Sequence, residues 1–169
     1  MPLRIKRARL CRLPALSLPQ GRVGLISDTH GLLRPEAVAA LQGSELIIHA
    51  GDIGGPGVLE GLRRLCPVAA VRGNNDRGAW ARGLPLGLEL RINDFVCYVV
   101  HDLRGLGAPP EPPAVVISGH SHRPKVEKSP GALFVNPGSA GPRRFKLPVT
   151  VARLTLGRGS AGAEIVEIL

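Results

Sequence analysis

Short apolar runs, each followed by a polar or glycine-rich turn, recur along the first half of the chain. Residues 23–26, 45–50 and 67–72 have the length and apolar content of buried strands. Between them, a helix that has proline in its first turn is predicted over residues 35–42, and a second helix over residues 58–65. Three strand–turn–helix units in series predict an α/β protein whose parallel sheet has right-handed crossovers.

The pattern changes in the second half of the chain. Asn93-Asp94 is a two-residue hairpin signal between predicted strands at 86–92 and 95–101. Four prolines in residues 102–113 exclude a long helix there. Further strands are predicted at 114–118, 125–128, 132–135, 148–156 and 163–168, the last four forming antiparallel pairs.

The composition is that of one globular domain with a sizeable core. The chain has 169 residues, of which 44% are hydrophobic and 21% charged. Aromatic residues make up 3%, too few for the stacking platforms that bind single-stranded nucleic acid. The net charge is +9, but residues 1–20 carry five basic residues and no acid, and only four of the 22 basic residues are lysine. The charge therefore gives weak support to a nucleic-acid partner.

Residues 1–20 are expected to be a disordered basic extension, or the product of an upstream start codon, preceding a single domain at 21–169. Prolines interrupt their short apolar stretch, which makes a poor secretion signal, and no run in the chain approaches membrane-spanning length. Cys11, Cys66 and Cys97 are odd in number and follow no motif spacing. We therefore expect no disulfide framework, and we expect a cytoplasmic location.

Polar residues gather at the predicted strand ends, where a parallel sheet binds its ligands. Asp28 and His30 are two positions apart, so they project to the same face of an extended backbone. Taken alone, this pair fits better with a strand that ends in a polar turn, in which Asp28 caps the next helix. Further candidates are G-D at 51–52, G-N-x-D at 73–76, His101 and G-H-x-H at 119–122. Carboxylate, amide and imidazole groups without thiolate suit a pair of divalent metals of borderline hardness.

Five motifs of this chain resemble, in the same order, those of the calcineurin-like metallophosphoesterases. They are S-D-T-H-G, G-D-I, G-N-N-D, G-H-S-H-R-P and N-P-G-S. The most similar branch is the small YfcE-like phosphodiesterases of bacteria and archaea, to which the retromer's phosphoesterase-like subunit is related. The resemblance covers residues 22–156. It implies a four-layer αββα sandwich, in which two mixed β-sheets lie face to face and helices flank them.

The resemblance also implies a ligand set for two divalent metal ions. Manganese is expected first, with iron, nickel, cobalt and zinc as alternatives. One metal would be held by Asp28, His30, Asp52 and His122, and the other by Asp52, Asn74, His101 and His120, with Asp52 as the bridge. A lone histidine at the end of an apolar strand is more often a satisfied core residue, so the assignment of His101 depends on the family context. His49 is expected to be buried or to lie behind the ligands.

The protein is predicted to be a metal-dependent phosphoesterase, and more specifically a phosphodiesterase. In the expected mechanism, a hydroxide that bridges the two metals attacks the phosphorus atom in line. The residues assigned to catalysis are Asp52, Asn74, Asn75, Asp76 and His101. Many phosphatases of the superfamily carry a histidine at the position of Asn75, where it can protonate the leaving group. Asparagine has no titratable proton, so we expect slow turnover of alkyl esters and faster turnover of aryl esters. Asp76 fits a plain turn and an orienting role equally well.

Two alternatives to an enzyme remain open: a non-catalytic metal-binding or protein-interaction scaffold on the same fold, and a nucleic-acid binder. The expected partners are a small phosphodiester or phosphomonoester substrate and a second copy of the chain in a homodimer, with no membrane. The 136–139 loop is expected to line the metal site, and Arg143 and Arg144 either meet a substrate phosphate or are solvated. Two departures from relatives, Asp102 in place of glycine and the proline-rich segment 102–113 in place of a helix, leave the substrate undetermined.

Overall fold

Two mixed β-sheets packed face to face form the body of the protein. The computed structural model describes residues 9–107 and 110–169. The first sheet has six strands in the order β1-β5-β6-β7-β9-β8. Their bounds are Leu10–Arg12 (β1), Gly87–Ile92 (β5), Phe95–Val100 (β6), Ala114–Ile117 (β7), Lys125–Ser129 (β8) and Ala132–Asn136 (β9).

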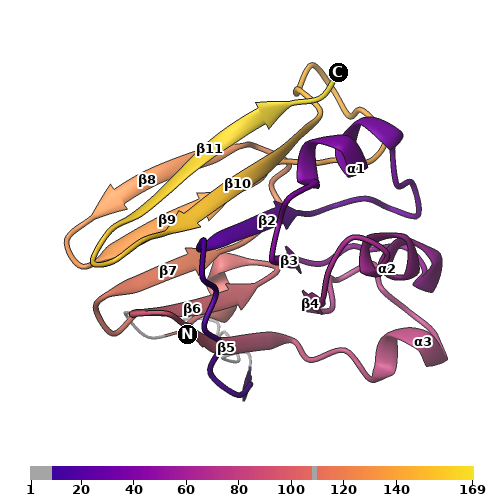
Figure 1. Cartoon of the computed structure of the whole chain (residues 1–169). Coiled ribbons are helices and arrows are strands. Elements are labelled where there is room, and N and C mark those ends of the chain that lie inside the picture. Colours follow the sequence, from indigo (N-terminus) through magenta and orange to yellow (C-terminus); the bar gives the residue numbers. More distant parts are fainter. Residues whose placement is uncertain (1–8, 108–109) are drawn as a thin grey trace, which may run out of the picture.

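The second sheet has five strands in the order β11-β10-β2-β3-β4 (Figure 1). Their bounds are Arg22–Ile26 (β2), Leu46–His49 (β3), Val68–Ala70 (β4), Thr150–Leu156 (β10) and Ala161–Glu167 (β11). As the sequence predicts, β2, β3 and β4 are parallel, while β10 joins β2 and β11 antiparallel. The carboxyl ends of β2, β3 and β4 therefore lie along one edge of this sheet.

The helices cover the outer face of the five-stranded sheet, and Figure 1 shows them on one side of the molecule. They are α1 (Pro35–Leu41), α2 (Pro56–Arg63) and the short α3 (Ala79–Arg82), which the sequence did not predict. Proline in the first turn of α1 and of α2 suits these starts, because its missing N–H would have no partner there. Apolar side chains such as Leu25, Ile48 and Val99 fill the space between the two sheets.

The outer face of the six-stranded sheet is covered differently. In the part of the chain that the structure describes, the only helix on this side is the 3-10 helix η1 (Leu103–Gly105). Leu106 packs there against the cluster around Tyr98, whose hydroxyl accepts a hydrogen bond from the backbone of Glu111 (3.4 Å). The predicted pair of mixed sheets flanked by helices is confirmed, and the layer outside the six-stranded sheet is reduced to η1 and the proline-rich segment.

The expectation that residues 1–20 form a disordered extension is wrong for residues 10–18. Strand β1 pairs in parallel with β5, and Leu16 bridges to Ile92. The side chain of Asn93 then accepts from the Leu18 amide (2.9 Å) and donates to its carbonyl (3.2 Å). Backbone pairing and these hydrogen bonds hold the segment against the domain. Residues 1–8 lie outside the described residues. No helix among the described residues has both the length and the apolar character needed to cross a membrane.

Candidate metal centre

Loops that follow β2, β3, β4, β6 and β7 meet at one edge of the two sheets. Backbone hydrogen bonds tie the first two together: Asp28 N–H donates to Gly51 O, His30 N–H to Asp52 O, and Gly31 N–H to Ile53 O, at 2.8–3.0 Å. The amide of Gly119, after β7, donates to the carbonyl of His101, after β6 (3.0 Å). These contacts fix the loops that carry the predicted ligands.

Five of the predicted ligands have a left-handed backbone conformation. Their φ angles, between 47° and 71°, belong to Asp28, His30, Asp52, His120 and His122. A residue other than glycine pays of order 1–3 kcal/mol for such a conformation, and this strain persists only where the surroundings hold it. Such residues cluster at functional sites, where the conformation aims a side chain.

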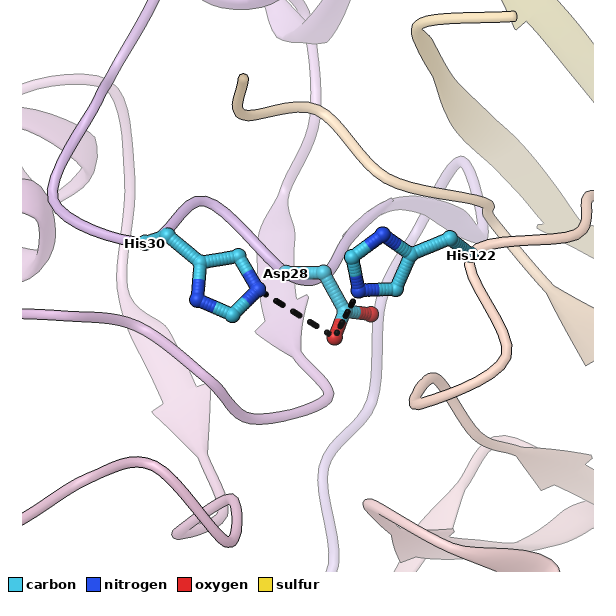
Figure 2. A group of neighbouring side chains, drawn as sticks. All are labelled: Asp28, His30 and His122. Carbon is cyan, nitrogen blue, oxygen red and sulfur yellow. Dashed lines mark ion pairs between the residues drawn. The ribbon is translucent and has the colours of Figure 1, made fainter. Parts of the chain in front are cut away.

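The first group of ligand atoms surrounds Asp28. Its Oδ1 lies 3.3 Å from His122 Nε2 and 4.0 Å from His30 Nε2, and the three ligand atoms all lie within 4.8 Å of one another. Figure 2 shows the two imidazoles on opposite sides of the carboxylate, both turned toward it. One carboxylate oxygen and two imidazole nitrogens converge here in the manner of a metal site.

The second group joins Asp28, Asp52 and His101. His101 Nε2 lies 3.4 Å from Asp52 Oδ2 and 3.9 Å from Asp28 Oδ1. The other ring nitrogen, Nδ1, lies 2.7 Å from the carbonyl of Ala50. A carbonyl can only accept, so Nδ1 carries the proton and Nε2 faces the carboxylates. His101 thus faces both carboxylates with a buried nitrogen that has no hydrogen-bond partner, and its role as a metal ligand stays a prediction.

Asp28 belongs to both groups, whereas the resemblance gives the shared position to Asp52. Asp52 Oδ2 also approaches both sides of the site, since it lies 3.9 Å from His30 Nε2 and 3.4 Å from His101 Nε2. Both carboxylates therefore sit between the imidazoles. The roles of the individual ligands, including the bridge, stay predictions.

Asn74 and His120 form the outer part of the site. Asn74 Oδ1 lies 3.2 Å from His120 Nδ1, and the rings of His120 and His101 meet edge to face with centroids 5.2 Å apart. The His120 side chain is 42% exposed, against 6% for His101. The loops thus bring all seven predicted ligand side chains to one edge of the molecule, with His120 at the solvent side.

Three polar atoms in this cluster fit a bound cation. Within the described residues, Asp28 Oδ1, His30 Nε2 and His101 Nε2 are buried and have no hydrogen-bond partner. A buried polar atom without a partner costs roughly 1–3 kcal/mol, more if it is charged. Cations bound at the two ligand groups would give each of these atoms a partner, so the residues present fit the divalent metals that the sequence implies.

The protonation of the cluster favours a cation as well. Burial alone would raise the pKa of Asp52, but contacts with His101 and Asn75 hold it well below its ordinary value. Burial would also raise the pKa of Asp28, but hydrogen bonds with His122 and Ser27 outweigh burial and lower the pKa. Burial lowers the pKa of His30, which keeps that imidazole neutral at pH 7. Ionised carboxylates and a neutral imidazole are the forms that bind metals.

For His101 the balance is reversed. Burial would lower its pKa, but the carboxylates of Asp52 and Asp28 outweigh burial and raise it. The direction of this shift reflects the two negative charges that face His101 Nε2, which a metal cation would also offset.

Asn75 and Asp76 orient the site rather than extend the ligand cluster. Asn75 donates twice to Asp52, from its backbone amide to Oδ1 (2.9 Å) and from Nδ2 to Oδ2 (2.8 Å). The two oxygens of Asp76 accept from the amides of Gly54 (3.0 Å) and Gly73 (2.8 Å), which joins the loops after β3 and β4. Of the two interpretations of Asp76, the orienting one matches this geometry.

Sequence reasoning missed several supporting residues. Ser27 donates to Asp28 Oδ2 (2.6 Å), and Thr29 donates to Ile53 O (2.8 Å). His49 is buried as expected; its Nδ1 accepts from the Gly51 amide (3.2 Å) and its Nε2 meets Thr29 Oγ1 (3.0 Å). The position of Ser27 and Thr29 inside S-D-T-H-G was the available signal.

The loop at 136–147 runs beside the site. Asn136 Nδ2 donates to Gly119 O (3.0 Å) and Ser139 Oγ to Asp28 O (3.0 Å), in line with the prediction for this loop. The charge of Arg144 contributes to the lowered pKa of His30, whereas Arg143 donates to the carbonyl of Leu169 (3.2 Å). The charge of Arg144 is thus felt at His30.

The sequence matches the model of the calcineurin-like phosphoesterase superfamily domain over residues 22–159. This chain belongs to that family. The chain is 36% identical over 161 residues to a protein named probable metallophosphoesterase from Methanothermobacter thermautotrophicus, covering 86% of this chain and 91% of the relative. The protein is therefore a metallophosphoesterase, a hydrolase whose family implies divalent metal ions.

Two solved structures share the fold. A structure described as a novel archaeal phosphodiesterase aligns with a TM-score of 0.69 at 22% identity, covering 86% of this chain and 99% of that one. The phosphoesterase YfcE of E. coli aligns with a TM-score of 0.63 at 21% identity, covering 88% of this chain and all of its own. The expected fold and the resemblance to YfcE-like proteins are thereby confirmed.

Proposed function

We propose that this metallophosphoesterase is a phosphodiesterase that works with two divalent cations on small phosphate diesters. The observation that carries the proposal is the set of three buried ligand atoms without partners, Asp28 Oδ1, His30 Nε2 and His101 Nε2. Both nitrogens lie within 4.0 Å of Asp28 Oδ1 and of Asp52 Oδ2, at the edge where both sheets end. Two overlapping ligand groups support two cations rather than one.

The residues that would hold the cations are Asp28, His30, Asp52 and His122 on one side and Asp52, Asn74, His101 and His120 on the other. When bound, the two ions supply positive charge that activates water near neutral pH and offsets charge on the phosphoryl oxygens. Asn75 holds the Asp52 carboxylate in place through two hydrogen bonds. Arg144 adds positive charge on the His30 side, where an anionic diester would gain from it.

We expect the departure of the leaving group to limit the rate of the reaction. Asn75 has no titratable proton to give, and its backbone N–H and one side-chain N–H already donate to Asp52. An alkoxide must then leave without a proton from this position, while a phenolate leaves easily because its charge is delocalised. We therefore propose aryl phosphodiesters as the better substrates.

The test is a screen on chelator-stripped protein reloaded with manganese, zinc, nickel, cobalt or iron. Substrates are a bis-aryl phosphodiester, an aryl phosphomonoester and a dialkyl phosphodiester. We expect the bis-aryl diester to be cleaved fastest and the dialkyl diester slowest. The change Asp52→Asn should lower kcat/KM by about 100-fold or more, since replacing residues that merely surround a metal site already costs roughly 10–100-fold.

Asp94→Asn is the matched control, because Asp94 is an exposed carboxylate in the turn between β5 and β6 and should leave the rate unchanged. Equal rates for the wild type and Asp52→Asn would remove the catalytic proposal and favour the scaffold. A dialkyl diester cleaved as fast as the bis-aryl diester would contradict the reasoning about Asn75.

A further inference from the structure

Asp102 lies directly after His101, between β6 and η1. Its carboxylate caps the 3-10 helix by accepting from the backbone amide of Arg104 (3.1 Å). The Arg104 guanidinium also donates to it through Nε (3.0 Å) and Nη2 (2.6 Å). The backbone amide and the guanidinium together hold the Asp102 side chain in one orientation.

The same carboxylate faces the metal centre. Asp102 Oδ2 lies 3.6 Å from His120 Nε2, within ion-pair range and longer than a hydrogen bond. The other nitrogen of that ring, Nδ1, lies 3.2 Å from Asn74 Oδ1. His120 therefore stands between a predicted metal ligand on one side and Asp102 on the other. A residue that only capped η1 would have no reason to face this ring.

His120 needs such a partner more than the other histidines of the site. Its side chain is 42% exposed, whereas those of His30, His101 and His122 are 14% exposed or less. Packing fixes the ring of a buried histidine, and the Ala50 carbonyl fixes His101 further. A solvent-exposed ring rotates freely unless hydrogen bonds hold it.

We propose that Asp102 is a positioning residue that sets the orientation and tautomer of His120 as a metal ligand. Asn74 and His120 would hold the metal through Asn74 Oδ1 and the lone pair of His120 Nδ1, so the proton of the neutral ring would be on Nε2, the atom that faces Asp102. A carboxylate that accepts this N–H fixes the ring and makes Nδ1 a stronger ligand. The inference rests on the proposed two-metal site, and it makes the affinity of the second metal depend on a residue outside the ligand set.

The experiment titrates Zn²⁺ into chelator-stripped protein by calorimetry. Wild-type protein should bind two ions, and Asp102→Ala should weaken one of them by about tenfold or more while leaving the other unchanged. Asp102→Asn keeps an oxygen that accepts from Nε2–H and should recover part of the loss. Asp94→Ala, which removes an exposed carboxylate elsewhere, should bind both ions as the wild type does.

A second measurement excludes a purely structural effect of the capping residue. In ¹⁵N-histidine NMR of the zinc-loaded wild type, the Nε2–H of His120 should give a signal protected from exchange, identified by its absence in His120→Ala. Asp102→Ala should lose this signal. Unchanged zinc affinities together with an unchanged signal, or a fall in thermal stability alone, would overturn the inference.

Failure of the underlying function has a different signature. A wild type that binds a single zinc ion would overturn the two-metal proposal. The His120 signal would then still decide whether Asp102 holds the ring: its loss in Asp102→Ala supports the positioning role, and its persistence overturns it.

Discussion

Two glycines leave the space in which the site carboxylates sit. A Cβ on Gly73 would come within 2.1 Å of both the backbone nitrogen and Oδ1 of Asp52, and a Cβ on Gly119 within 2.0 Å of Ser27 Oγ. Neither glycine has a positive φ, so the requirement is steric and concerns the close approach of two loops. The backbone atoms of Asp52 cannot move without moving the ligand itself.

Gly73→Ala should therefore disrupt the metal centre. Because the new methyl group displaces Asp52, we expect zinc affinity to fall by more than about tenfold, measured by calorimetry on chelator-stripped protein. Gly57→Ala is the matched control, since nothing lies within 4 Å of a Cβ on this residue of α2. It should bind zinc normally and gain roughly 0.5–1 kcal/mol of stability from better helix propensity. Normal zinc binding by Gly73→Ala would contradict the steric argument.

His49 should make metal-free protein sensitive to mild acid. Burial lowers the pKa of His49 from 6.5 to about 4, so between these values the unfolded chain binds a proton that the folded one does not. The free energy of unfolding should thus fall as pH drops from 6.5 to 4, by about 3 kcal/mol from this group. Urea unfolding across this range, compared with His49→Gln, isolates the contribution. Parallel pH profiles for the two proteins would show that His49 is not held neutral.

The residue types of the metal centre could be predicted from sequence, but their conformations could not. The motifs D-x-H, G-D and G-H-x-H contain side chains that the loops bring together, because strand ends meet along one edge. The left-handed φ of Asp28 and of His120 left no mark in the sequence, since both residues more often adopt other conformations. The contact between Asp102 and His120 was equally hidden, because it joins turns 18 positions apart.

At the scale of elements, the hairpin turn at Asn93 links parts of the chain that are distant in sequence. Its side chain binds both backbone groups of Leu18 and donates to the carbonyl of Leu156 (3.0 Å). Asn93 has a φ of 52°, which asparagine tolerates better than most residues. One turn thereby holds the segment after β1, the β5–β6 hairpin and the end of β10 together.

Replacing Asn93 should destabilise the fold without touching the metal centre. Asn93→Ala loses three hydrogen bonds and keeps a strained φ, so we expect a loss of about 2–4 kcal/mol in the free energy of unfolding. Asn93→Gly loses the same bonds but relaxes the backbone, and should recover about 1 kcal/mol. Urea unfolding measures both, and zinc affinity should stay at the wild-type value. Equal stability of the two variants would mean that the φ of Asn93 carries no strain.

Elements with a strong local signal were predicted well. The three buried strands, their helices and the Asn93-Asp94 hairpin all appear close to their expected bounds, because apolar period and turn residues determine them locally. The segment at 10–18 was misjudged, since its basic and proline-rich sequence hides a strand whose stability comes from pairing with β5. Helix α3 has four residues, too few for a periodic pattern.

For the whole molecule, the arrangement of the ligands couples metal binding to the packing of the two sheets. Asp28, His30 and Asp52 follow strands of the five-stranded sheet, and His101 and His122 follow strands of the six-stranded one. A cation bound among them would link the two sheets at their shared edge, in addition to the apolar contacts between them. Metal binding should then stabilise the complete fold rather than one loop.

Removing the metal should consequently lower the melting temperature of the entire domain. A site filled at 100 times its Kd adds about 2.7 kcal/mol, which for a chain of this length is about 5–10 °C. Thermal unfolding in excess Zn²⁺ and in chelator measures the difference, and Asp52→Asn should reduce it because that carboxylate approaches imidazoles from both sheets. Hydrogen exchange locates the effect: protection should rise in β2 and β3 and also in β6 and β7. Added protection in the five-stranded sheet alone would mean that the cation does not bridge the sheets, and the ligands that follow β6 and β7 would then have to be reassigned.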